Sequence, residues 1–104
     1  MSGAANGLRG EAVLRLGAQE MVLRPSFAAL VAAEAEVGPL FALVDKAADG
    51  ALGLGEMLAL FWHIAVDRPA NMSREAMGQA MLDAGLAQLM PVLRQIFGQI
   101  LQGR

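Results

Sequence analysis

Cysteine and tyrosine are both absent from this 104-residue sequence, which has one histidine and one tryptophan. Without cysteine, the chain has no disulfide, no thiolate metal ligand and no thiol nucleophile. With a single histidine, few side chains are suited to titrate near neutral pH. The glycines are spread among turns and helix ends and form no phosphate-binding loop. We therefore expect the protein not to be an enzyme and to use no cofactor.

Charged residues are also scarce, at 17% of the chain against about 25% in an average globular domain. Hydrophobic residues make up 56%. A domain of this size cannot bury so much apolar material, so part of it is expected to contact another chain. The basic residues are scattered singly and the net charge is −2. Direct nucleic-acid binding is not expected, because it requires clustered positive charge.

The N-terminal residues lack the apolar segment of a secretory signal, and no apolar helix reaches the ~20 residues that span a bilayer. We therefore expect a cytoplasmic protein without a membrane partner. Residues 1–9 are small and polar and are predicted to form a flexible arm. Residues 10–104 are predicted to form one α+β domain, an N-terminal β-hairpin followed by a compact bundle of four to five short helices.

The hairpin is predicted from two short stretches, residues 10–16 and 20–24, on either side of a spacer that contains Gly17. Apolar and polar side chains alternate in the first stretch, and Gly17 is expected to take a positive φ in the turn. A lone two-stranded ribbon is only marginally stable in water. We therefore expect it to lie across the helices or to pair with a sheet edge of a partner.

Capping signals divide the remaining chain into helices. Ser26 and Ser73 are candidate N-caps, and Gly38 and Gly85 are typical of helix ends. The predicted helices cover residues 27–37, 40–48, 54–66, 74–84 and 86–102. The last of them is expected either to start near Met90, with Pro91 in its first turn, or to kink at Pro91. The apolar side chains expected to cluster on one face of the first helix are Phe27, Leu30, Val31 and Val37. Those expected to point inward from the second helix are Leu40, Phe41, Leu43, Val44 and Ala47.

The stretch from Leu54 to Val66 has the densest run of large apolar side chains. On a helix these side chains spread over roughly two thirds of the circumference, against the stripe of about 100° that a surface helix needs. The stretch is therefore predicted to be the centre of the bundle. Leu60 and Trp62 lie on the two flanks of its apolar arc, and they are candidate partner contacts if they prove exposed.

The narrow polar strip of this helix carries Glu56, His63 and, if the helix continues for one more turn, Asp67. His63 and Asp67 are one turn apart, a spacing suited to a divalent metal. No second histidine and no cysteine can complete a zinc site. A solvated strip or a polar contact with a partner explains the same residues, so we predict no metal site here.

The last helix, residues 86–102, has the cleanest amphipathic pattern in the chain. Its polar side carries a neutral stripe of glutamines, Gln88, Gln95, Gln99 and Gln102. Arg94 is its only charge. Because amides cost less to bury than charges, the stripe suggests a covered surface and predicts self-association through this helix. An ordinary solvated face is the alternative.

The run from Arg9 to Leu30, RGEAVLRLGAQEMVLRPSFAAL, resembles the opening of a family of gene transfer agent and prophage proteins. Family members are described as tail assembly chaperones and, in some cases, as tail tube proteins. The shared features are a strand that begins with Gly-Glu, a glycine-containing turn, a strand that ends in Leu-Arg-Pro and a helix entered through Ser-Phe. The likeness continues to the Gly85-Leu86 break and covers nearly the whole chain from Arg9 onward.

The resemblance implies a protein of phage-like tail morphogenesis that acts by binding. The leading hypothesis is a tail assembly chaperone for the apolar, helical tape-measure protein. The alternative is a structural tail tube component that assembles in the particle by strand addition. The third is a small metal-dependent enzyme that uses Glu56, His63 and Asp67. The expected partners are the tape-measure protein or other tail proteins, together with further copies of this chain. No site residue transfers from the family, because it has no catalytic motif.

Overall fold

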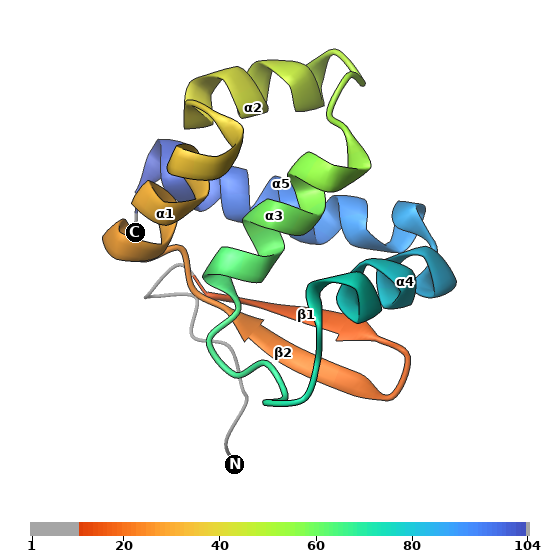
Figure 1. Cartoon of the computed structure of the whole chain (residues 1–104). Helices are drawn as coiled ribbons and strands as arrows, with labels where there is room; N and C mark the ends of the chain where they lie inside the picture. The colour runs from red at the N-terminus through yellow and green to blue at the C-terminus, as the bar shows by residue number, and fades with distance from the viewer. Residues whose placement is uncertain (1–10, 104) are drawn as a thin grey trace.

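The computed structural model describes residues 11–103, so the predicted arm at residues 1–9 lies outside the described part. Two strands precede five helices in this part of the chain (Figure 1). The strands are β1, Ala12–Leu16, and β2, Gln19–Leu23. The helices are α1, Phe27–Val37; α2, Leu40–Ala48; α3, Leu54–Ile64; α4, Arg74–Ala84; and α5, Leu86–Gln102. The predicted α+β fold is confirmed.

The two strands form an antiparallel hairpin in which Leu16 pairs with Gln19 across a two-residue turn. Gly17 opens the turn at a φ of 64°, the left-handed conformation that the sequence predicted. Alternate residues of β1, Ala12, Leu14 and Leu16, are buried. They face α4 and α5, which contact β1. The hairpin therefore lies across helices of its own chain, one of the two predicted arrangements.

The outer edge of β2 is covered by the segment that follows α3. The Arg24 N–H donates to the Ile64 carbonyl at 2.8 Å, and the Val66 N–H donates to the Val22 carbonyl at 3.0 Å. These bonds satisfy backbone groups that point away from β1. The prediction of a helix to Val66 is therefore wrong: the helix ends at Ile64, because the next residues pair with β2.

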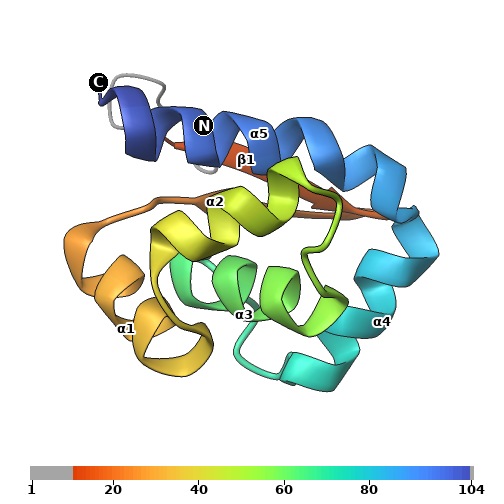
Figure 2. The ribbon, with the colours of Figure 1, turned by 90° about the horizontal axis from the view of Figure 1, so that it is seen from above.

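Helix α3 is the centre of the bundle, as predicted. It packs closely against α1 and α4, and Figure 2 shows it between them. In the same view α5 runs along β1 at the top. Its buried residues are Met57, Ala59, Leu60, Phe61 and Ile64. Phe61 is 0% exposed. Replacing a phenylalanine buried to this degree with alanine typically costs about 3–5 kcal/mol.

Both predicted serine caps are present. The Ser26 Oγ accepts the Ala29 N–H at 3.2 Å, and the Ser73 Oγ accepts the Ala76 N–H at 3.0 Å. Each cap satisfies a backbone donor that the first turn of a helix leaves free. These short-range bonds fix the starts of α1 and α4.

Helix α1 buries only part of its predicted apolar cluster. It rests on α3 through Ala33, which is 0% exposed, with Leu30 and Val37 half-buried at the sides. Phe27 and Val31 are 84% and 47% exposed, so the apolar cluster expected on this helix is only partly buried. The small Ala33 side chain allows the two helices to approach closely, and this contact rotates the larger side chains outward.

Helix α2 is the element least attached to the others. Every other element makes several close backbone contacts with a neighbouring element, and α2 makes fewer. Leu43 is the only residue of α2 that is fully buried. Phe41 is 74% exposed, so the prediction that it points into the core is wrong. The reason is that α2 uses a narrow face for packing, and its other apolar side chains lie beside a gap next to α5.

No single helix among residues 11–103 is long and apolar enough to cross a membrane. Helices α1 and α2 taken together pass that test by length and composition alone, and they are bent by 72° at their junction.

Candidate partner-binding groove

An apolar groove runs between α2 and α5. It consists of two adjoining cavities of about 230 and 390 Å³ that share Val44 and Leu101. The first cavity is lined by Glu34, Leu40, Phe41, Val44, Ile100 and Leu101. The second is lined by Val44, Ala47, Ala48, Met90, Leu93, Arg94, Phe97, Gly98 and Leu101. Among these residues only Glu34 and Arg94 are charged.

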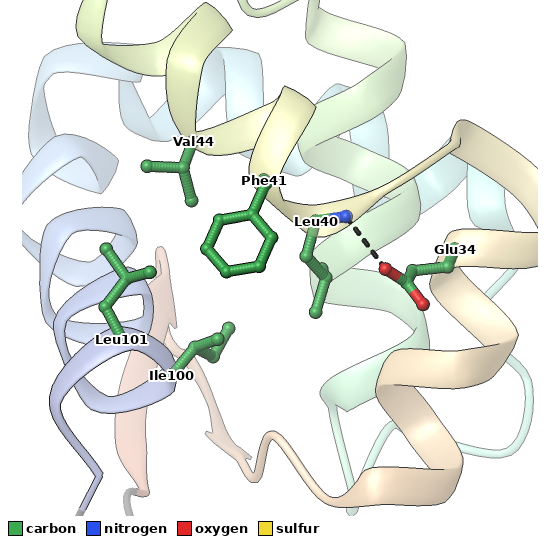
Figure 3. Close-up of a pocket in the computed structure, with 6 residues that line it drawn as sticks. All are labelled: Glu34, Leu40, Phe41, Val44, Ile100 and Leu101. Atoms are coloured by element: carbon green, nitrogen blue, oxygen red, sulfur yellow. Dashed lines mark hydrogen bonds between the residues drawn. The ribbon is translucent and has the colours of Figure 1, made fainter.

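Phe41 dominates the first cavity. Figure 3 shows its ring directed into the space between the helices, with Ile100 and Leu101 approaching from α5. Phe41 and Leu101 are 74% and 47% exposed. Contiguous apolar side chains that remain exposed on a small domain are typical of a site that another molecule covers.

Polar contacts near both ends of α2 connect it to α1 and α3. The Leu40 N–H donates to a carboxylate oxygen of Glu34 at 2.9 Å. The Lys46 ammonium pairs with Glu56 of α3 at 2.5 Å. The Lys46 hydrogen bond, helped by the Gly53 N–H, holds the pKa of Glu56 below its ordinary value. These contacts position α2 beside α5 without filling the space between them.

The α5 wall of the groove is long enough to lie against a few turns of another helix. Helix α5 contributes side chains from Met90 to Leu101, which corresponds to about 16 Å of helix, or three turns. Gly98 lies in this wall, and a Cβ atom added there would meet nothing within 4 Å. A helix laid into an apolar groove is a recurrent mode of peptide recognition.

The sequence analysis did not predict this groove, because it placed Phe41 on an inward face. The one signal for it was the surplus of apolar residues over what a domain of this size can bury.

The two candidate contacts on α3 lie outside the groove. Leu60 is in the core at 1% exposure and is not accessible in this structure. Trp62 is half-buried, and the Arg68 guanidinium stacks over its ring at 3.9 Å from the centroid. Arg74 lies 5.3 Å from the same centroid. The Trp62 ring is therefore already engaged by two cations of its own chain.

Two members of the glutamine stripe lie near the β1 end of the chain, and no member lines the groove. Its members are Gln88, Gln95, Gln99 and Gln102. The Gln95 Nε2 lies 3.5 Å from the Glu11 carbonyl oxygen, and Gln88 lines a cavity of about 140 Å³ beside β1. The Oε1 of the half-buried Gln99 is buried and has no partner among the described residues. Part of the stripe thus contacts the chain's own hairpin, and self-association through α5 stays a prediction.

The structure does not bring Glu56, His63 and Asp67 together. Glu56 is engaged at the start of α3. His63 lies 2.9 Å from Glu36, and Asp67, beyond the end of α3, accepts the Val22 N–H at 2.8 Å. Within residues 11–103, no three side chains of the metal-binding types are arranged to hold an ion.

Glu36 is the centre of a polar cluster that joins α1, α3 and α4. Its carboxylate accepts hydrogen bonds from Arg74 and His63. These bonds, that of Arg74 first, hold the pKa of Glu36 below its ordinary value. The cluster lies outside the set of residues that line the groove, so we assign it to the connection between helices.

A family model described as "Phage tail tube protein, GTA-gp10" matches residues 9–103, which include the hairpin and all five helices described above. No curated protein and no solved structure matches the chain.

Proposed function

The chain belongs to the phage tail tube protein family GTA-gp10, and we propose that it acts there as a tail assembly chaperone for the tape-measure protein. Membership confirms the resemblance to gene transfer agent tail proteins, and other tail proteins are the partners that it suggests. In this proposal the α2–α5 groove holds an apolar helical segment of the tape-measure protein and keeps it soluble during tail assembly.

The open groove is the observation that carries this proposal. Its lining is apolar along both helices, and Phe41 is three-quarters exposed in the isolated chain. Met90 lines it as well, and methionine adapts easily to different apolar partners. A chaperone needs a surface of this kind, because it must release its client when the tube forms.

The proposed action is binding without chemistry, in the cytoplasm, before the tail is complete. The polar side chains that a hydrolytic mechanism would use have other roles: Ser26 and Ser73 cap helices, and His63 contacts Glu36. This supports a role that depends on a surface.

A structural tail tube component is the second candidate, and the free edge of β1 favours it. In a two-residue hairpin paired at Leu16, the backbone N–H and C=O groups of Val13 and Arg15 point away from β2. No backbone partner for them occurs among the described residues. A strand of a neighbouring subunit can pair with such an edge. The family description, a phage tail tube protein, fits this candidate as well as the first.

Copurification separates the two candidates. The tagged full chain should capture the tape-measure protein from producing cells and be absent from finished particles. Gly98→Leu should abolish capture, because the new side chain enters the groove. Gly55→Leu is the matched control, since it places leucine at an open helical position on α3 outside the groove. Many copies of the chain in purified particles, or equal capture by both variants, would overturn the chaperone proposal.

A further inference from the structure

Arg94 is the one cation among residues 11–103 without a charged or aromatic partner. Four of the others form ion pairs: Arg15 with Glu20, Arg24 with Glu11, Lys46 with Glu56, and Arg74 with Glu36. Arg68 stacks on Trp62. Arg94 is exposed, and it differs in this respect from the other described arginines and the lysine, each of which has a charged or aromatic partner.

This unpaired arginine lies in the wall of the groove. Arg94 is the only charged residue of α5, and it lines the larger cavity of the groove beside Leu93 and Phe97. Water leaves this wall when an apolar helix fills the groove, and charge–charge attraction strengthens as water is excluded. A guanidinium there also has several N–H donors free for a planar acceptor.

We propose that Arg94 selects the client by binding a carboxylate carried by the helical segment of the tape-measure protein that fills the groove. This inference rests on the proposed function. Arginine matches a carboxylate with two parallel hydrogen bonds, which fixes orientation as well as adding affinity. Glu34 carries a negative charge in the other cavity, where it would repel an acidic residue. The client's carboxylate is therefore placed at the Arg94 end, and this sets the direction in which the segment lies.

The test uses the full chain and overlapping synthetic peptides that cover the tape-measure protein, each long enough for about four helical turns. Affinities are measured by titration calorimetry for the wild type, Arg94→Gln and the matched control Arg15→Gln. Arg15 is an exposed arginine of the hairpin, outside the groove. We expect Arg94→Gln to weaken the best peptide by roughly tenfold, the effect of one charge-assisted hydrogen-bonded pair. Arg15→Gln should have no effect.

A double-mutant cycle identifies the partner group. Replacing the peptide's Glu or Asp by the corresponding amide should weaken binding to the wild type and have little further effect on Arg94→Gln. If a peptide binds, and its affinity falls in Phe41→Ala but is unchanged in Arg94→Gln, this inference is overturned and the proposed function stays intact. Failure of every peptide to bind the wild type would overturn both. Far-UV circular dichroism and thermal unfolding check that the variants remain folded.

Discussion

Phe41→Ala should weaken client binding strongly and leave the fold intact. Complete burial of a phenylalanine side chain contributes up to about 3 kcal/mol. Phe41 is 74% exposed in the free chain, so covering the exposed part contributes about 2 kcal/mol, or roughly 30-fold in Kd. Because only about a quarter of this side chain is buried before binding, the free energy of unfolding should change by less than about 1 kcal/mol.

Peptide titration measures the Kd, and urea unfolding measures the stability of each variant. Phe27 provides a matched control. Phe27 is 84% exposed on α1 and is not part of the groove lining. Phe27→Ala removes the same apolar side chain from a different surface, so it should leave the Kd unchanged. An equal loss of affinity in both variants would show that exposed aromatics act without regard to position. No loss in Phe41→Ala would refute the groove as the binding site.

Three further predictions concern stability. Asp67→Ala should lower the free energy of unfolding, measured in urea, by about 1–3 kcal/mol, because it leaves the buried Val22 N–H unpaired. Asp67→Asn should lower it less, since the amide keeps an acceptor oxygen. Equal losses in the two variants would contradict the hydrogen bond. The folded-state pKa of Glu36 lies below 4.5, so its stabilising contribution is complete above about that pH and is lost as the pH falls through the lowered value. The Tm difference between the wild type and Glu36→Gln should therefore be largest at neutral pH and shrink in acid, and a constant difference would contradict the cluster. Gly98→Ala should raise the free energy of unfolding by about 0.8 kcal/mol through helix propensity. Gly78→Ala should gain less, because its Cβ would lie 3.1 Å from the Leu58 side chain; the reverse order in urea would contradict the packing.

Local signals in the sequence were enough to predict most of the helix boundaries. Ser26 and Ser73 form the expected caps, and the glycines at 38 and 85 take positive φ where the helices end. Gly17 does the same in the hairpin turn. Each of these features depends on residues within a few positions, so the sequence alone carries the information.

The end of α3 depended on a contact with a distant part of the chain. Residues up to Val66 continue the apolar pattern of a helix, but Val66 pairs with Val22, which is far away in sequence. No feature of the sequence near Val66 indicates this partner. A pattern of apolar residues could therefore find the helix but not its last residue.

The groove was unpredictable for a related reason. A helical wheel shows which side chains share a face, but not how closely a second helix approaches that face. Phe41 was assigned to an inward face, and it does face Leu101 of α5, with space between α2 and α5. The glutamine stripe was recognised as unusually neutral, yet its contact with the Glu11 carbonyl depends on how α5 crosses β1.

Methyl NMR of the full chain tests the groove most directly. The labelled protein is titrated with unlabelled tape-measure protein or its best-binding peptide. If the groove holds the client, the methyl resonances of Val44, Ile100 and Leu101 should shift most, and that of Val13 on the free edge of β1 should stay unchanged. Shifts confined to Val13 and its neighbours on the hairpin would contradict the groove and favour strand addition.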